Sequence, residues 1–248
     1  MTESRRAVVI TGAGGALGAA LSCRFAAEPE TDLVLSDVSQ SSLDATLAGL
    51  PDRRGDVATL LADVSDFEQV DAVVQLAASR FGHVDALISN AGVLAPNGRI
   101  HNLETADWER AFRVNVLGAV NGIRAAVGVM RQQRSGAIVL TASVAGLTAW
   151  SHAAPYCATK AAVIQLAKVA AVEYARDGIR VNCVCPGTFL SAIHEGLPHE
   201  AIDAIAAKHP LGLGAATDLV GAYSYLASDA ARWTTGSALV VDGGYAAP

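Results

Sequence analysis

Short apolar runs alternate with longer amphipathic segments along the whole of this 248-residue chain. The expected strands are residues 7–11, 32–36, 58–62, 85–89, 136–141, 179–184 and 237–241. Between them, the spacing of apolar residues predicts helices near 16–27, 41–49, 66–80, 105–132, 156–176 and 217–228. Unbroken apolar runs are typical of parallel strands covered on both faces, and strand–helix alternation implies right-handed crossovers. The sequence therefore predicts an α/β fold, a doubly wound parallel seven-stranded sheet with helices on both faces.

One segment departs from this alternation. Residues 186–217 contain four glycines and three prolines. This segment is too long for an ordinary connection between two elements. Long connections in compact domains are usually binding loops, so we expect a substrate loop or lid at about 187–216. No repeat, low-complexity tract or linker interrupts the rest of the chain, and we expect residues 1–248 to form a single domain.

Composition excludes several classes of protein. With 52% hydrophobic and 17% charged residues, the chain has enough apolar surface to fold. The mean hydropathy is positive, at +0.34, but the richest apolar stretch, Ala161 to Val172, is interrupted by Gln165 and Lys168, so no membrane span is expected. The net charge is −6 and no basic cluster exceeds an arginine pair, which argues against nucleic acid or an anionic membrane as a partner.

Cysteines and histidines give no sign of a disulfide framework or a metal site. The cysteines are Cys23, Cys157, Cys183 and Cys185, and we expect free, buried thiols. The loop histidines His194, His199 and His209 lack the carboxylate spacing of a metal site. Residues 1–6 lead directly into the first expected strand and leave no room for a signal peptide, so a cytoplasmic location is expected.

A glycine-rich turn follows the first expected strand, in the order Thr11-Gly12-Ala13-Gly14-Gly15-Ala16-Leu17-Gly18. Glycines at a strand-to-helix turn let the backbone approach a pyrophosphate at the positive end of the helix. Asp37 ends the second expected strand, 19 residues past Gly18. An acid there accepts hydrogen bonds from the adenosine ribose and repels a 2′-phosphate. The sequence therefore predicts a dinucleotide site that prefers NAD.

Tyr156 and Lys160 stand four residues apart at the start of an expected helix and so share one face of it. A phenol titrates near pH 10, too high for a general base at neutral pH. A neighbouring ammonium group favours the phenolate, and so does the positive nicotinamide of an oxidised cofactor, so we expect Lys160 and the bound cofactor to lower the pKa of Tyr156. Such a pair by itself also occurs by chance on surface helices.

Further motifs appear in a fixed order along the chain. They are Asp63-Val64, Asn90-Ala91-Gly92, Asn115, Ser143, Tyr156-x-x-x-Lys160, Pro186-Gly187 and Val241-Asp242-Gly243-Gly244. With the glycine turn and Asp37, this series resembles the short-chain dehydrogenase/reductase family from end to end. The resemblance implies a Rossmann-like fold, a nicotinamide cofactor and a homotetramer.

The resemblance also implies roles for individual residues. Tyr156 is similar to the family's acid/base, Ser143 to the serine that orients the substrate oxygen, and Lys160 to the residue that binds the nicotinamide ribose. Asn115 is similar to the helix asparagine that holds a water for proton relay. The implied cofactor-binding residues are Gly12, Gly14, Gly15, Ala16, Leu17, Gly18, Asp37, Asp63, Val64, Asn90, Ala91, Gly92, Tyr156, Lys160, Pro186, Gly187 and Thr188.

Two positions depart from the family pattern. Ala16 stands at the middle glycine of the turn, where we expect a methyl group to be tolerated. Ser191 replaces the final threonine of the P-G-x-x-x-T motif and keeps its hydroxyl. Neither change removes a catalytic group.

The expected substrate pocket is largely apolar. Its candidate residues are Leu94, Val144, Trp150, His152, Phe189 and Ile193. His152 is a candidate ligand for a polar substrate group, or else a residue of the pocket rim or of an interface. Arg99 is the single candidate cation for an anionic substrate. Acyl transfer is disfavoured because Ser143 lies outside a G-x-S-x-G motif.

These features predict an NAD-dependent oxidoreductase that interconverts a secondary alcohol and a ketone, with a small-molecule substrate. Two alternatives stay open, a 3-oxoacyl thioester reductase that uses NADPH and a cofactor-binding sensor without catalysis. The helix at 161–175 is apolar on almost every side, which predicts a homo-oligomer. The substrate's identity, its stereochemistry and the direction of the reaction do not follow from the sequence.

Overall fold

A seven-stranded parallel sheet forms the centre of the computed structural model, which describes residues 5–53, 55–191 and 198–247. Its strands are β1 (Arg6–Thr11), β2 (Thr31–Asp37), β3 (Val57–Leu61), β4 (Ala86–Ser89), β5 (Gly136–Thr141), β6 (Ile179–Pro186) and β7 (Ala238–Val241). They lie in the order β3-β2-β1-β4-β5-β6-β7, and every neighbouring pair is parallel. The predicted doubly wound parallel sheet is therefore confirmed.

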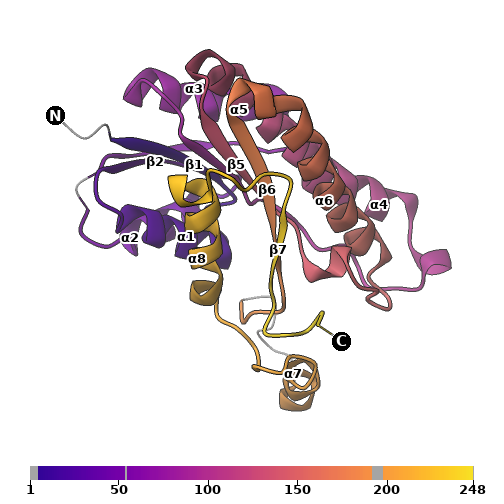
Figure 1. The fold of residues 1–248 in the computed structure, drawn as a ribbon. Helices are drawn as coiled ribbons and strands as arrows, with labels where there is room; N and C mark the ends of the chain where they lie inside the picture. The colour runs from indigo at the N-terminus through magenta and orange to yellow at the C-terminus, as the bar shows by residue number, and fades with distance from the viewer. Residues whose placement is uncertain (1–4, 54, 192–197, 248) are drawn as a thin grey trace.

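Helices cover both faces of the sheet. They are α1 (Ala16–Ala26), α2 (Gln40–Ala48), α3 (Phe67–Phe81), α4 (Thr105–Phe112), α5 (Gly118–Gln133), α6 (Ala154–Tyr174), α7 (His199–Ala206) and α8 (Ala216–Ala227). Figure 1 shows α1, α2 and α8 on one face and α3, α5 and α6 on the other, with α7 apart from both layers. Helix α7 lies in the segment expected to be a loop, so its helical turns were not predicted.

The buried core has two parts, one on each face of the sheet. Leu21, Phe25 and Tyr223 pack between the sheet and the helices α1 and α8. Val73 and Ile164 belong to the cluster beneath α3, α5 and α6. Because the inner strands of the sheet are buried on both faces, their apolar residues are continuous rather than alternating, as the sequence indicated.

The helix expected at 105–132 is interrupted by a wider turn. Helix α4 ends at Phe112, a π-helical segment covers Arg113–Leu117, and α5 begins at Gly118. Asn115 lies in the middle of this π-helical segment and is buried. Such segments are often found at functional sites, because the wider turn displaces side chains and carbonyl groups from the regular ladder.

The strand order reverses between β1 and β4, which are direct neighbours in the sheet. In open α/β sheets, ligands bind in the crevice at the carboxyl ends of the strands at such a switch point. The glycine turn after β1 and the Asn90 segment after β4 both begin there. Among the described residues, no helix is long and apolar enough to cross a membrane.

Candidate active site

A cavity of about 1040 Å³ opens at the carboxyl ends of the strands. The predicted residues that line it are Gly12, Gly15, Ala16, Leu17, Gly18, Asp37, Asp63, Val64, Asn90, Ala91, Gly92, Leu94, Ser143, Trp150, Tyr156, Lys160, Pro186, Gly187, Thr188 and Phe189. They come from both sides of the switch point and from the start of the predicted lid. The structure thus brings together residues that are up to about 180 positions apart in the sequence.

The glycine turn lies close against its surroundings. Gly12 has a positive φ of 65°, which side-chain-bearing residues rarely adopt. A Cβ atom on Gly18 would lie 2.0 Å from the carbonyl oxygen of Gly12, so only glycine fits there. Helix α1 begins directly afterwards, and no side chain caps its first N–H groups. A turn of this kind leaves the helix N-terminus open to an anion.

The Asp37 carboxylate is fixed by two backbone groups. The Gly14 N–H donates to its Oδ2 at 2.9 Å, and the Ser39 N–H donates to its Oδ1 at 3.1 Å. These bonds hold the carboxylate beside the glycine turn, on the wall of the cavity. The cations among the described lining residues are Arg110, Lys160 and Lys208, and none of them belongs to β2 or to the loop after it.

Asn90 joins the ends of three strands. Its Nδ2 donates to the carbonyl oxygens of Thr11 and Gly12, at 3.2 and 3.1 Å, and its Oδ1 accepts from the Thr141 hydroxyl at 3.3 Å. The Thr141 hydroxyl also contacts the Tyr223 hydroxyl at 2.9 Å. The side chains of Asn90, Thr141 and Tyr223 therefore link the ends of β1 and β5 to α8 at the cavity floor.

Ser143 and Tyr156 meet on the wall of the cavity. Ser143 caps a short 3-10 helix, and its Oγ accepts from the Ala145 N–H at 3.1 Å. Burial raises the pKa of the Tyr156 phenol, while a hydrogen bond with Ser143 opposes that rise and the nearby Cys157 adds to it. The Tyr156 ring also stacks on Trp150, with 6.1 Å between the ring centres.

Lys160 is buried, with 4% of its surface exposed, one helical turn after Tyr156. Its Nζ donates to the Thr141 carbonyl oxygen at 2.8 Å and lies 5.6 Å from the centre of the Tyr156 ring. Burial lowers the pKa of Lys160 to about 8, and the nearby Cys185 opposes that shift. The predicted lowering of the Tyr156 pKa by Lys160 is not seen, because the ammonium group points to Thr141 and burial dominates at the phenol.

The buried ammonium group gives a prediction for stability. The pKa of Lys160 falls from 10.5 in the unfolded chain to about 8 in the fold, so between these values the unfolded chain binds the extra proton. Stability then rises with pH across that window and is lowest below it. Relative to Lys160→Met, we expect the wild-type free energy of unfolding to rise by about 3 kcal/mol from about pH 7 to about pH 10.

Urea unfolding at a series of pH values measures this difference. Lys168→Met is the matched control, since Lys168 lies on the same helix but is exposed. Its difference from the wild type should not vary with pH. A difference between the wild type and Lys160→Met that stays constant over the same range would contradict the prediction.

Asn115 lies behind the cavity wall rather than on it. Its Nδ2 donates to the Val93 carbonyl oxygen at 2.9 Å and to the Thr159 hydroxyl at 3.0 Å, and its Oδ1 accepts from the Val93 N–H at 2.7 Å. A Cβ atom on Gly92 would lie 3.2 Å from Asn115 Oδ1 and 3.3 Å from Lys160 Nζ. Asn115 and Lys160 are therefore separated by little more than the Gly92 backbone.

Four other residues that were predicted to belong to the site are not among the described residues that line the cavity. Gly14 is behind the lining, bonded to Asp37. Val144 is fully buried at the start of the 3-10 helix and does not reach the cavity. His152 is exposed, has a positive φ of 66° and contacts the hydroxyl of Ser151 at 2.9 Å; Ser151 lines the cavity and His152 does not. Ile193, like His194, lies outside the described residues.

Sequence reasoning missed several residues of the cavity. Arg110 of α4 and Tyr245 line it without having been expected, whereas Ile205, Lys208 and His209 line it from within the expected loop or lid at about 187–216, although none was named as a site residue. Arg99, the expected cation, is not among the lining residues. Tyr245 follows Gly243 and Gly244, whose positive φ angles turn the chain back towards the cavity. That glycine pair was a usable signal, whereas Arg110 and Lys208 had none, because their approach depends on how α4 and α7 pack.

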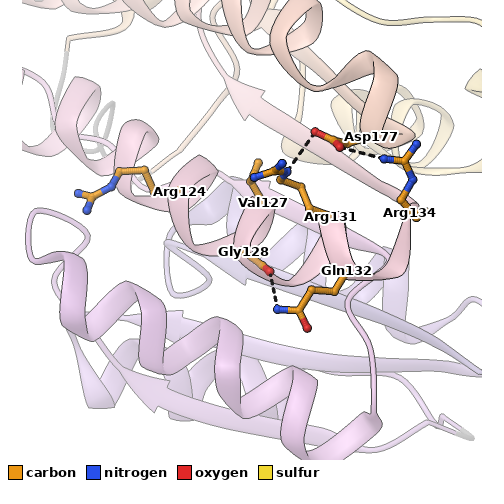
Figure 2. A pocket seen from close by; sticks show the side chains of 7 residues that line it. All are labelled: Arg124, Val127, Gly128, Arg131, Gln132, Arg134 and Asp177. Atoms are coloured by element: carbon orange, nitrogen blue, oxygen red, sulfur yellow. Dashed lines mark hydrogen bonds and ion pairs between the residues drawn. The ribbon is translucent and has the colours of Figure 1, made fainter.

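A second, shallower hollow lies on the surface between α5 and the turn before β6. Figure 2 shows the Asp177 carboxylate facing Arg131 and Arg134, which bind it at 3.1 and 2.9 Å. Gln132 bonds to the Gly128 carbonyl oxygen. The one carboxylate among the residues that line this hollow is thus already paired, and none of the predicted site residues lies there. The strand-end cavity is the better candidate for catalysis.

Among the described residues, no three His, Cys, Asp or Glu side chains come together in a group that could hold a metal ion. The cysteines Cys23, Cys157, Cys183 and Cys185 are free thiols, as predicted. Cys183 and Cys185 are buried, and the other two are partly buried.

Comparison with known proteins gives relatives along nearly the whole chain. The cis-4-hydroxycyclohexanecarboxylate dehydrogenase of Sinomonas cyclohexanicum is 37% identical, over 98% of each chain. The 3-oxoacyl-(acyl-carrier-protein) reductase of Thermotoga maritima is 32% identical, over 95% of this chain and 96% of its own. Residues 12–246 match a family described as enoyl-(acyl carrier protein) reductase.

Solved structures agree with these relatives. A protein from Burkholderia xenovorans, described as a short-chain dehydrogenase/reductase, is 35% identical and superposes with a TM-score of 0.92, over 98% of this chain and 97% of its own. The structure of ElxO with NADP bound is 27% identical, with a TM-score of 0.91, over 98% of this chain and all of its own. The chain belongs to the short-chain dehydrogenase/reductase family.

Proposed function

We propose that this protein is an NAD-dependent oxidoreductase that interconverts a secondary alcohol and a ketone by hydride transfer. The observation that carries the proposal is the meeting of Ser143, Tyr156 and Lys160 on one wall of a cavity that also contains the glycine turn. A hydroxyl pair beside a buried ammonium group suits proton exchange with a substrate oxygen. The relatives named as dehydrogenases and reductases support this reaction class.

The cavity suits a dinucleotide. The close approach of Gly18 to Gly12, the uncapped start of α1 and the fixed Asp37 carboxylate are the features that a pyrophosphate and an adenosine ribose require. Asp63 and Val64 would contact the adenine, and Asn90, Ala91 and Gly92 would line the floor. At the other end, the backbone after Gly187 would meet the nicotinamide carboxamide. When bound, the nicotinamide supplies the acceptor or the donor of the hydride.

The chain's own residues handle the proton. In alcohol oxidation, the Tyr156 phenolate, which the positive charge of a bound oxidised cofactor would favour, takes the hydroxyl proton of the substrate, and the Ser143 hydroxyl donates to the same oxygen and fixes its orientation. In ketone reduction, the phenol returns that proton. Burial lowers the pKa of Lys160 to about 8, so this group can exchange a proton with solvent near neutral pH, with Asn115 behind it as the relay position.

Asp37 supports NAD over NADP. Its carboxylate would bind both ribose hydroxyls and repel a 2′-phosphate, and none of the described cavity cations lies beside it. Ala16 is the first residue of α1, and its side chain is exposed. These features favour NAD, although a structural relative carries NADP.

The outer cavity supports a largely apolar substrate. Leu94, Trp150, Phe189, Ile205 and Tyr245 form much of its wall. Thr188, Phe189, Ser191, Ile205, Lys208 and His209 come from the segment at about 187–216. We therefore propose that this segment acts as the substrate lid, within the single domain of residues 1–248.

The direct test mixes the purified protein with NAD and a panel of secondary alcohols, and follows the absorbance of NADH. We expect the protein to oxidise at least one cyclic or branched alcohol, and to do so more slowly with NADP than with NAD. A protein that binds NADH but oxidises no alcohol and reduces no ketone would favour the sensor reading instead.

A 3-oxoacyl thioester reductase is the second candidate. The Thermotoga maritima relative and the description of the matching family favour it, and Arg110 and Lys208 add positive charge to the outer cavity. This function requires rapid reduction of a 3-oxoacyl thioester by NADPH. The same panel with that substrate and both reduced cofactors separates the two candidates.

We further propose that the protein forms a homo-oligomer. The family resemblance implies that this oligomer is a tetramer. The supporting observation is the exposed apolar side of α6, where Val169 is 45% and Val172 is 81% exposed. Light scattering on the purified protein tests this assembly. A monomer at micromolar concentration would overturn it.

A further inference from the structure

His209 is buried at the edge of the cavity, yet the proposed chemistry does not use it. Only 4% of its surface is exposed. It lies just beyond the C-terminal end of α7, and its ring packs against Tyr245 with 4.8 Å between the ring centres. A buried imidazole must satisfy both ring nitrogens, so their partners define its role.

The partners of the ring assign its tautomer. Nε2 accepts from the Thr188 N–H at 3.1 Å, because a backbone amide can only donate. Nδ1 lies 3.0 Å from the Ile205 carbonyl oxygen, which can only accept, so Nδ1 carries the proton. His209 therefore joins the end of the lid helix to the first residue after Pro186-Gly187.

The segment after Gly187 is held at three points by the far end of the lid, one of them the Thr188 carbonyl oxygen, which accepts from the Gly214 N–H at 3.4 Å. The Thr188 N–H is bound by His209, and the Leu190 N–H donates to the Gly214 carbonyl oxygen at 2.9 Å. Between them, the Phe189 N–H finds no acceptor within the described part of the chain. Phe189 lines the cavity, so a ligand oxygen can approach this N–H group from there. Because the N–H groups of Thr188 and Leu190 are both bonded, the direction of the Phe189 N–H between them is restricted.

We infer that His209 is a positioning residue for the nicotinamide end of the cofactor, acting through Thr188 on the free N–H of Phe189. The inference rests on the proposed function, since the ligand group is the carboxamide oxygen of the nicotinamide. Loss of the Nε2 acceptor frees the Gly187–Thr188 peptide. The next peptide, which carries the Phe189 N–H, is then held at its Thr188 carbonyl oxygen by the long bond from the Gly214 N–H alone, at 3.4 Å. The glycine turn and Asp37 lie at the other end of the cavity and contact none of these groups.

A matched pair of variants isolates the acceptor. His209→Gln places an amide oxygen near the position of Nε2 and can still accept from Thr188. His209→Asn has the same polarity but is shorter by one methylene group, so it reaches towards Ile205 and not Thr188. Thermal unfolding of both variants establishes that they fold. Should His209→Asn not fold, His209→Phe replaces it, because it keeps the ring against Tyr245 and lacks the acceptor.

Binding is measured with NADH by fluorescence and with ADP-ribose by competition, because ADP-ribose lacks the nicotinamide. We expect His209→Asn to weaken NADH binding about tenfold, the effect of losing one hydrogen bond, and to leave ADP-ribose binding unchanged. His209→Gln should restore NADH binding to within about twofold of the wild type. A merely structural role would weaken both ligands together.

Three outcomes would overturn the role of His209 alone. They are unchanged NADH binding in His209→Asn, equal weakening of NADH and ADP-ribose, and a failure of His209→Gln to restore binding in a folded protein. Wild-type protein that bound neither ligand would instead overturn the proposed function. The two failures are therefore distinguishable in one set of titrations.

Discussion

Tyr156→Phe should lose about a thousandfold or more in kcat, since general acid–base catalysis contributes roughly 10² to 10⁴ in rate and no other described side chain replaces the phenol. Ser143 shares the substrate oxygen but titrates far too high to act as a base, and Lys160 is turned to Thr141. Phenylalanine keeps the ring that stacks on Trp150, so the cavity wall should stay in place.

The measurement combines steady-state kinetics with NADH titration. Binding of NADH should stay within about twofold of the wild type, because the phenol proton contributes little to the affinity for the dinucleotide. Tyr174→Phe is the matched control, since Tyr174 lies at the far end of the same helix and outside the cavity lining. Full turnover by Tyr156→Phe would exclude Tyr156 as the acid/base.

The fold could be predicted from the sequence because its signals are local and periodic. Seven apolar runs separated by helical segments leave few arrangements other than a doubly wound sheet, and the switch point follows from the strand order. Helix α7 was not predicted, because a glycine- and proline-rich segment weakens any helical signal around it. The π-helical segment at Arg113–Leu117 was also missed, since a single wider turn does not change the apolar period.

The candidate site divides in the same way. Glycine spacing, Asp37 and the Tyr156–Lys160 pair lie within short motifs, so the sequence locates them. The proton state of Lys160 and the direction of its ammonium group depend on burial and on the Thr141 carbonyl oxygen, which are properties of packing. For that reason the expected effect of Lys160 on the phenol was not found. His209 was expected only as part of the loop or lid segment and not as a site residue, because its bond to Thr188 joins positions 21 residues apart.

Asp37→Asn should lower the preference for NAD over NADP by about two orders of magnitude, expressed as the ratio of the two kcat/KM values. A charged hydrogen bond to the ribose is worth about 1.5 to 3 kcal/mol, and its weakening lowers activity with NAD. Removal of the negative charge also ends its repulsion of the 2′-phosphate, which raises activity with NADP. Both changes move the ratio in the same direction.

The side chain has a second role that the experiment must separate from the first. The Asp37 carboxylate also accepts from the N–H groups of Gly14 and Ser39, so a smaller residue would loosen the glycine turn and weaken both cofactors. Asparagine keeps one acceptor oxygen and limits that loss. Asp44→Asn removes the same charge from the exposed side of α2 and should leave the ratio unchanged. A parallel fall in activity with NAD and NADP in Asp37→Asn would mean that this carboxylate supports the turn and does not select the cofactor.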